Sequence, residues 1–391
     1  MIEIFLTIFF ISVLLFFLGT GIWVAISMIG VSSIGMMLFT SRPVGDAMAT
    51  TIWGASSSWT LTALPLFVWM GEILFRTKLS ENLFKGLAPW MQKLPGGLIH
   101  VNVVGCALFA AISGSSAATV ATVGKMSIPE LRKRKYPETI LLGSLAGSGT
   151  LGLLIPPSII LIIYGVTVQE SIAKLFIAGI IPGIMIALIF MSYVIVWSLI
   201  NKQSMPVSLE TFSFLEKIKK SKQLMPVILL ILAVIGSIYT GIATATEAAS
   251  LGVVGALILS YLQKSLTKET FKASLLGATK TSCMIAFILA GATFLSLAMG
   301  FTGLPRNLAI WIQGMELSPY VLIFVLMVFY IILGMFLDGI SAVVLTMAII
   351  EPMIRQAGFD MIWFGIFLVI VVEMAQITPP VGFNLFVLQG M

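Results

Sequence analysis

The stretch Gly-Leu-Leu-Ile-Pro-Pro-Ser, residues 152–158, interrupts a strongly apolar segment, and a similar stretch, Ala-Gln-Ile-Thr-Pro-Pro-Val-Gly, follows at residues 375–382. Two consecutive prolines cannot continue a helix, because they remove backbone donors and clash with the preceding turn. Within a bilayer, an opened backbone is tolerated only where it is buried in protein or lines a polar cavity. Two such breaks in corresponding places of two halves indicate a transporter binding site, and a pair of plain helix kinks is the alternative.

The composition of the 391-residue chain is that of a helical membrane protein. Hydrophobic residues make up 59% and charged residues only 10%, whereas a soluble domain carries about 25% charged residues. Many apolar runs reach the roughly 20 residues that span a bilayer. The net charge of +6 fits basic cytoplasmic loops better than nucleic-acid binding. We therefore expect an all-α polytopic protein surrounded by membrane lipid, with no nucleic-acid partner.

The residues that usually carry enzyme chemistry are sparse. Cys106 and Cys283 lie in apolar runs and form neither a metal-ligand spacing nor a disulfide framework. The single histidine, His100, fits a loop or an interface. No Cys/His cluster, glycine-rich phosphate loop or nucleophile triad is visible in the sequence, so we predict that the protein is not an enzyme.

The first half of the chain, residues 1–200, is predicted to contain a helical hairpin that enters and leaves the membrane on one side. Its two apolar arms, at 98–112 and 117–126, are too short to span, since 15 residues make roughly 22 Å of helix. They meet at Ser113-Gly114-Ser115-Ser116, and basic residues flank both outer ends. A single kinked spanning helix is the alternative, which the positive-inside rule disfavours. The other elements expected in this half are scaffold helices within 1–75 (Ile2–Leu18, Ile22–Phe39 and Ile52–Leu74), an amphipathic arm at 76–97, the hairpin at 98–128, a broken helix at 139–166 and a helix at 172–200.

The second half follows the same plan after a basic linker at residues 201–223. Gly114 precedes Pro156 by 42 residues, and Gly339 precedes Pro379 by 40, so each tip stands at a similar distance from its break. The expected elements of residues 224–391 are scaffold helices within 224–300 (Leu224–Ala243, Ala248–Leu262 and Cys283–Met299), an arm at 305–315, a hairpin at 320–354 and a broken helix at 361–391.

The distribution of lysine and arginine predicts the orientation. The loops 76–93, 129–135, 201–222 and 263–272 hold most of these residues and should be cytoplasmic, which leaves the N-terminus in the periplasm. The two halves then have opposite topology, as in inverted-repeat transporters. Because only the first half has a long helix after its broken span, we expect that the sequence lacks one final membrane helix.

The tips and breaks are rich in oxygen donors. Opened backbone supplies carbonyls, and Ser113, Ser115, Ser116 and Thr378 supply hydroxyls. Such neutral oxygen ligands suit a hard monovalent cation rather than calcium, which prefers several carboxylates. Asp338 is ionisable and stands at an intramembrane tip, which makes it a functional candidate, although it would also serve as a helix N-cap. The serines could instead be small residues that let helices approach closely.

Four motifs resemble the large membrane subunit of TRAP (tripartite ATP-independent periplasmic) transporters: Gly-Ser-Ser-Ala-Ala-Thr-Val-Ala-Thr-Val-Gly (114–124), Leu-Gly-Leu-Leu-Ile-Pro-Pro-Ser-Ile (151–159), Ala-Thr-Ala-Thr-Glu-Ala-Ala (243–249) and Gln-Ile-Thr-Pro-Pro-Val-Gly-Phe-Asn-Leu-Phe (376–386). The resemblance implies an elevator-type fold in the bacterial inner membrane and uptake of an organic acid driven by Na+. It also implies two partners, a periplasmic substrate-binding protein and a small membrane subunit, which is fused or separate; because no such segment precedes Met1, we expect a separate chain. Where the family often has Thr-Pro-Thr-Glu, this chain has Ala245 in place of the proline.

The resemblance also implies two sodium sites and a substrate site between the tips. The residues of the first sodium site are Ser113, Ser115, Gly152, Ile155 and Pro157. Those of the second are Gly339, Ser341, Thr378 and Pro380, together with Gly241 and Thr244. Substrate is expected near Ser116 and Asp338.

Two other functions stay open on the sequence. A stand-alone ion-coupled anion transporter or antiporter of related architecture would need no binding protein. A structural membrane subunit of a larger complex would need no ion sites. The identity of the organic acid is not predicted, because C4-dicarboxylates, sialic acids, sugar acids and keto acids all fit.

Overall fold

The computed structural model describes residues 2–76, 79–206, 212–222, 224–303, 307, 310, 314, 318–380 and 382–391. The described residues form helices and connections and contain no strand. In the first half the helices are α1 (Ile2–Gly19), α2 (Val24–Phe39), α3 (Val44–Ser56), η1 (Trp59–Thr62), α4 (Ala63–Phe75), α5 (Leu79–Met91), α6 (Ile99–Ser113), α7 (Ser116–Lys133), α8 (Glu138–Gly149), η2 (Thr150–Leu153), α9 (Ile159–Thr167) and α10 (Ile172–Ile200). From the linker onward they are η3 (Lys202–Ser204), α11 (Phe214–Ser221), α12 (Met225–Tyr239), α13 (Ala245–Leu262), α14 (Lys268–Thr302), α16 (Pro319–Gly334), α17 (Gly339–Gln356), α18 (Met361–Gln376) and α19 (Phe383–Gln389).

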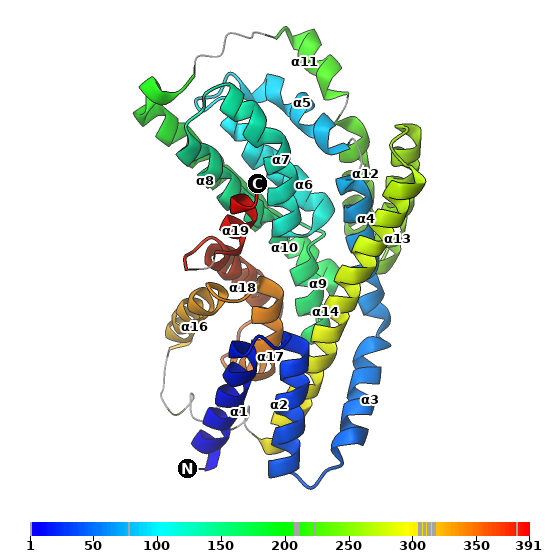
Figure 1. The fold of residues 1–391 in the computed structure, drawn as a ribbon, viewed down its shortest axis with the longest axis vertical. Coiled ribbons are helices and arrows are strands. Elements are labelled where there is room, and N and C mark those ends of the chain that lie inside the picture. Colours follow the sequence, from blue (N-terminus) through cyan, green and yellow to red (C-terminus); the bar gives the residue numbers. More distant parts are fainter. Residues whose placement is uncertain are drawn as a thin grey trace.

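The helices pack in two groups, which lie side by side in Figure 1. In one group, the long helix α14 packs against α2, α3 and α4, and α4 packs against α13. In the other, α6 packs against α7 and α8, α18 packs against α16 and α17, and α19 closes onto α7 and α8. We call the first group the α14 group and the second the hairpin group. They meet where α4 contacts α6 and α9 and where α14 contacts α17.

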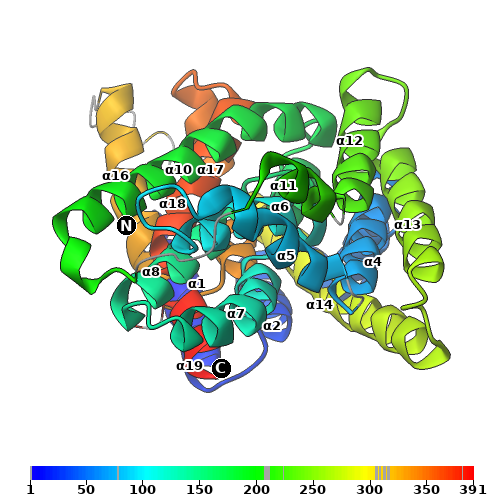
Figure 2. The same cartoon turned by 90° about the horizontal axis from the view of Figure 1, so that it is seen from above.

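One end of the molecule is covered by two helices that are distant in the sequence. Figure 2 shows α5 and α11 lying across this end, and the two helices are in contact. The indole nitrogen of Trp90 donates a hydrogen bond of 2.7 Å to the hydroxyl of Ser221. The Lys217 ammonium lies 5.3 Å from the centre of the Trp90 ring, which is within the range of a cation–π contact. The linker is therefore fastened to the segment that precedes the first hairpin.

Several helices are long and apolar enough to cross a bilayer. Among the described residues these are α10, α13, α14 and α17, and two bent helix pairs bring the number of possible spans to 6. Helix α10 turns large apolar side chains outward, for example Ile181, Leu188 and Ile200. Such a surface is stable against lipid or another apolar helix but not against water. The chain is thus a multi-pass membrane protein.

Several of the expected elements differ from the structure. The predicted single helix Ile52–Leu74 is wrong, since the chain breaks at Ser57 and Ser58 and bends by 54° between the helices on either side. Consecutive serines compete for backbone hydrogen bonds and weaken a helix. The helix expected to start at Cys283 already starts at Lys268, where Thr267 caps it.

The return helices of both hairpins are also longer than predicted. Helix α7 continues through Pro129 to Lys133, and α17 continues through Pro352 to Gln356. A proline inside a helix removes one hydrogen bond but does not always end it when neighbouring helices pack around it. Most of the arm predicted at 305–315 lies outside the described residues.

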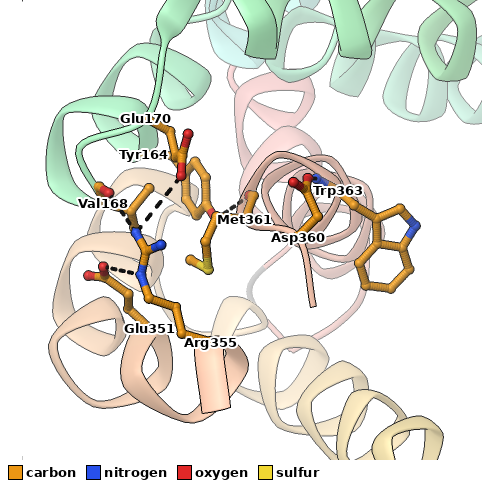
Figure 3. Close-up of polar contacts among 8 residues, drawn as sticks. All are labelled: Tyr164, Val168, Glu170, Glu351, Arg355, Asp360, Met361 and Trp363. Atoms are coloured by element: carbon orange, nitrogen blue, oxygen red, sulfur yellow. Dashed lines mark hydrogen bonds and ion pairs between the residues drawn. The ribbon is translucent and has the colours of Figure 1, made fainter. Parts of the chain in front are cut away.

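A polar seam joins the first half to the second within the hairpin group (Figure 3). The buried hydroxyl of Tyr164, in α9, donates a hydrogen bond of 2.6 Å to the Met361 carbonyl at the start of α18. The Arg355 guanidinium, in α17, bonds the Val168 carbonyl at 3.1 Å and the Glu351 carboxylate at 2.9 Å. The Tyr164 bond joins α9 to α18, and the Arg355–Val168 bond joins the end of α9 to α17, so the two halves are held together here.

We predict that Tyr164→Phe lowers the stability of the detergent-purified protein. The substitution removes one of the hydrogen bonds to the Met361 carbonyl, which should cost about 0.5–1.5 kcal/mol, the usual net contribution of a hydrogen bond within a protein. Thermal unfolding followed by tryptophan fluorescence measures the effect.

The matched control is Tyr193→Phe, which removes a hydroxyl from a side chain in α10 that is 58% exposed. It should unfold at the wild-type temperature. Equal unfolding temperatures for Tyr164→Phe and the wild type would show that the seam does not contribute to stability.

Candidate functional site

The first hairpin turns at Gly114, which lies in the left-handed region with φ of 60°. Glycine adopts this conformation without the strain that a side chain would bring. A Cβ atom at this position would also stand 2.5 Å from the Pro157 carbonyl oxygen. Gly114 is therefore required for two reasons: it forms the turn, and it lets the tip contact the first Pro-Pro break.

Three side chains and one carbonyl oxygen lie close together around this turn. The hydroxyls of Ser113 and Thr119 lie 2.9 Å apart. Both are also close to the Ser115 carbonyl oxygen, at 3.3 Å and 2.7 Å respectively. The Ser115 hydroxyl caps α7 by accepting from the Ala118 amide at 3.5 Å. Thr119 was not among the predicted site residues, although its spacing of four residues from Ser115 places it on the same helix face.

The first break packs against this tip through its backbone. After η2 the chain is not helical until Ile159, whose amide donates to the Gly114 carbonyl at 3.3 Å. A Cβ atom at Gly152 would stand 2.6 Å from the Ser115 carbonyl oxygen and 2.9 Å from the Thr119 hydroxyl. Ser158 caps α9 and donates to the Leu153 carbonyl, which satisfies part of the opened backbone.

The structure thus brings together four of the five residues predicted for the first sodium site. Ser113 and Ser115 form the tip, Gly152 lies against the Ser115 carbonyl, and the Pro157 carbonyl lies against Gly114. Ile155 is the fifth, and its carbonyl is the group predicted to contribute; its side chain packs toward α10, where its Cγ1 atom would stand 2.8 Å from a Cβ at Gly183.

The base of the first hairpin is fixed by Tyr136, in the connection between α7 and α8. Its hydroxyl accepts a hydrogen bond of 3.1 Å from the Leu98 amide, just before α6 begins. Burial raises the pKa of Tyr136, so the phenol stays neutral. The hairpin is consequently held at its base and at its tip.

The second hairpin turns at Asp338, which caps α17. One carboxylate oxygen accepts from the amides of Ile340 and Ser341, at 3.1 Å and 3.2 Å. The N-cap interpretation of Asp338 is therefore correct, and the carboxylate also brings a negative charge to the tip. Ser341 is buried in the first turn of α17.

The end of α18, just before the second break, packs against this second tip. A Cβ atom at Gly339 would stand 2.7 Å from Val372 and 2.9 Å from the Gln376 amide nitrogen. The Thr378 hydroxyl donates to the Met374 carbonyl at 2.6 Å, and Pro380 follows in an exposed position. Val381 lies outside the described residues.

A single glutamine joins the two halves of the site. The Ser116 hydroxyl, in the first turn of α7, donates a hydrogen bond of 2.8 Å to the side-chain oxygen of Gln376. Both residues are buried. Gln376 therefore contacts the first tip with its oxygen and faces the second tip with its nitrogen. Sequence reasoning did not single out Gln376, and its position two residues before Thr378 was the available signal.

Two predicted residues lie elsewhere. Gly241 and Thr244 are in the connection between α12 and α13, beside the α14 group. The Thr244 hydroxyl and amide bond the Glu247 carboxylate at 2.9 Å and 2.8 Å, which caps α13. Within the described part of the chain, none of their hydrogen bonds reaches the second tip.

The oxygen atoms that could act as metal ligands at the two tips come from hydroxyl, amide and carbonyl groups and from one carboxylate. The described residues contain no group of three or more His, Cys, Asp or Glu side chains that could hold a metal ion together. Oxygen ligands of low total charge favour a monovalent hard cation over a transition metal or calcium. The Ser113 and Thr119 hydroxyls and the Ser115 carbonyl are the oxygen ligands that lie closest together at the first tip, and ligands of this kind could hold such a cation.

Comparison with known proteins identifies the family of this chain. The family model of the "Tripartite ATP-independent periplasmic transporter, DctM component" matches residues 11–391. The C4-dicarboxylate TRAP transporter large permease protein DctM of Pseudomonas aeruginosa is 32% identical over 92% of this chain and 84% of its own length. The sialic acid TRAP transporter large permease protein SiaM of Vibrio cholerae is 31% identical over 95% of this chain and 86% of its own.

A solved structure shares the fold at low sequence identity. The Alcanivorax borkumensis YdaH transporter superposes with a TM-score of 0.64, at 12% identity, over 96% of this chain and 90% of its own. The likeness in fold, the matching family model and the similarity along almost the whole length agree. This chain belongs to the TRAP transporter family as a large permease subunit of the DctM type.

Proposed function

We propose that this permease carries an organic acid across the bacterial inner membrane, driven by the sodium gradient. The observation that supports this most directly is the contact between the first tip and the first break, where Ser113, Thr119 and the Ser115 carbonyl converge opposite Gly152. Sodium bound there would join two segments that are otherwise held by few bonds. Occupancy of the site would then fix the tip in a shape that binds substrate.

The substrate class is suggested by the helix ends at the tips. Helix α7 begins at the first tip and α17 at the second, and a helix N-terminus attracts anions. Asp338 already occupies amides of α17, whereas α7 is capped by the neutral Ser115. An anionic group of the substrate should therefore lie nearer to Ser116 than to Asp338. Relatives are named for C4-dicarboxylate, sialic acid and 2,3-diketo-L-gulonate, which are carboxylates, and for isethionate, which is a sulfonate, so an anionic acid group is what these substrates share.

The movement that we propose is a displacement of the hairpin group along the α14 group, as in an elevator. The two groups touch at Gly71 of α4, where a Cβ atom would stand 3.1 Å from the Cα atom of Ser113. Because Gly71 has no side chain, the surface of the α14 group has no projecting group beside the tip at this contact. The inverted relation of the two halves would let the same site open to either side of the membrane.

We further propose that two partners complete the transporter. A periplasmic binding protein would deliver the acid, and a small membrane subunit would cover apolar surface of the scaffold. A related isethionate permease from Oleidesulfovibrio alaskensis is named DctMQ, and this chain covers 59% of its length. A stand-alone ion-coupled transporter is the second candidate, because the two tips and breaks lie within this one chain.

Substitution of site hydroxyls should weaken sodium activation. We predict that Ser113→Ala raises the sodium concentration for half-maximal uptake about tenfold or more in proteoliposomes. A lost contact to a charged group costs about 1.5–3 kcal/mol, and about 1.4 kcal/mol is a factor of ten. Thr378→Ala should do the same at the second break.

The controls are substitutions of the same type outside the site. Ser192→Ala in α10 removes a hydroxyl bonded only to the preceding turn at 2.8 Å in the described contacts, and Thr279→Ala in α14 does likewise at 2.8 Å. Both should keep wild-type sodium activation. Wild-type activation in Ser113→Ala and Thr378→Ala would contradict the assignment of these sites.

Reconstitution separates the two transport functions. We predict that the chain alone transports little acid. Adding a matching binding protein and small subunit should raise uptake at least about tenfold, because the binding protein would deliver the acid and the small subunit would cover the apolar surface. The measurement is uptake of labelled acids with an inward sodium gradient. Equal uptake without the partners would favour the stand-alone transporter.

A further inference from the structure

Helix α18 carries a carboxylic acid in its buried face, one turn and a half before the second Pro-Pro break. Glu373 is only 4% exposed. Its Oε1 atom is completely buried and has no hydrogen-bond partner among the described residues. Ionisable residues inside a membrane protein are costly and usually functional. The sites described above do not use this residue.

The position of Glu373 is central to the hairpin group. Helix α18 packs against α9, α10, α16, α17 and η2, and it lies in the middle of the group in Figure 1. Seven residues earlier, Ile366 stands beside Gly179 of α10, which also touches the Leu154 carbonyl of the first break. Because seven residues are almost two helical turns, Glu373 is on the face of α18 that meets α10 and the first break. One turn later comes Gln376, which binds Ser116 of the first tip.

The equivalent position in the first half shows that the fold alone does not require a carboxyl group. Glu373 precedes Pro379 by six residues, and Thr150 precedes Pro156 by six. Thr150 is also buried, but its hydroxyl is satisfied by the Gly147 carbonyl at 2.8 Å. A threonine completes the first broken span without an ionisable group, so the acid in the second span calls for another explanation.

The surroundings of Glu373 offer it no cation in the described residues. Of the helices packed on α18, α9 and α16 present two buried phenols, which are engaged elsewhere: Tyr164 with Met361 and Tyr330 with Thr346. At the far end of α17, Arg355 pairs with Glu351. The remaining titratable groups of these helices are Lys174, Tyr193 and Tyr320, which are exposed, and the acids Asp338 and Asp360, which cap α17 and α18. An ionised carboxylate without a partner is very costly to bury, so this packing fits the neutral acid.

We propose that Glu373 is a proton-binding site carried by the moving hairpin group, so that a proton travels inward with each substrate. The inference rests on the proposed transport function. The carboxylate would take a proton from periplasmic water when the hairpin group faces outward, and the neutral acid would pack as seen here. After the group moves, water from the cytoplasm would reach the site and the proton would leave, which restores the carboxylate. No other bond forms or breaks.

The experiment measures protons and substrate in the same vesicles. The complete transporter is reconstituted into proteoliposomes that contain a pH-sensitive dye, with an inward sodium gradient and a labelled acid that the wild type carries. We expect acidification of the lumen in step with uptake, at about one proton per substrate. Glu373→Gln should reduce that ratio to near zero and flatten the dependence of uptake on pH, because the amide stays neutral at every pH.

A matched control removes a carboxylate outside the hairpin group. Asp46→Asn, at the exposed start of α3, should keep the wild-type proton ratio and pH profile. If the Glu373→Gln variant transports no substrate, the Glu373→Asp variant tests the inference instead. It retains a carboxyl group, but in a changed position. A shifted pH profile for Glu373→Asp supports the proposal, and an unchanged profile overturns it.

Three results would overturn the inference. The first is substrate uptake by the wild type without proton entry. The second is an unchanged proton ratio in Glu373→Gln, which would move the proton site elsewhere. The third is a Glu373→Gln variant that is altered only in its sodium requirement, which would make Glu373 a sodium ligand. If the wild type carries no organic acid at all, the proposed function fails first, and the inference fails with it.

Discussion

The backbone of the first tip touches the backbone of the first break, and the rest of the site depends on that contact. Gly152 leaves room for the Ser115 carbonyl, and Gly114 leaves room for the Pro157 carbonyl. Any side chain at either glycine would force the two segments apart. The close approach places the first break beside the cluster that the Ser113 and Thr119 hydroxyls form with the Ser115 carbonyl.

The second tip and the end of α18 are tied into this arrangement by the close approach at Gly339 and by polar side chains. Gln376 reaches Ser116 of the first tip, and Asp338 holds the start of α17. The hydrogen bonds of Tyr164 and Arg355 join the same two halves of the chain at a second place. The hairpin group is therefore one packed unit, which is the property that a rigid-body movement needs. Glu373 lies inside this unit without a described partner, so its charge state bears on the packing of both halves.

Much of the site could be predicted from the sequence because prolines and glycines act locally. The Pro-Pro pairs and the Ser-Gly-Ser-Ser turn interrupt helices wherever they occur, so the breaks and the first tip were found by inspection. Gln376 and Thr119 could not be found in this way, because their roles depend on contacts made across the fold. Gly241 and Thr244 came from the family resemblance and lie by the α14 group. The bend at Ser57 and Ser58 was missed because apolar residues on both sides suggested one continuous helix.

The contact between tip and break is tested most directly by sodium binding to a variant in which only that contact is altered. In Gly152→Ala the added Cβ atom would stand 2.6 Å from the Ser115 carbonyl oxygen, whereas at Gly143, in α8 of the same span, nothing lies within 4 Å. Saturable binding of radioactive sodium to the purified, folded proteins should be lost in Gly152→Ala and retained in Gly143→Ala. Wild-type sodium binding by folded Gly152→Ala would contradict the account.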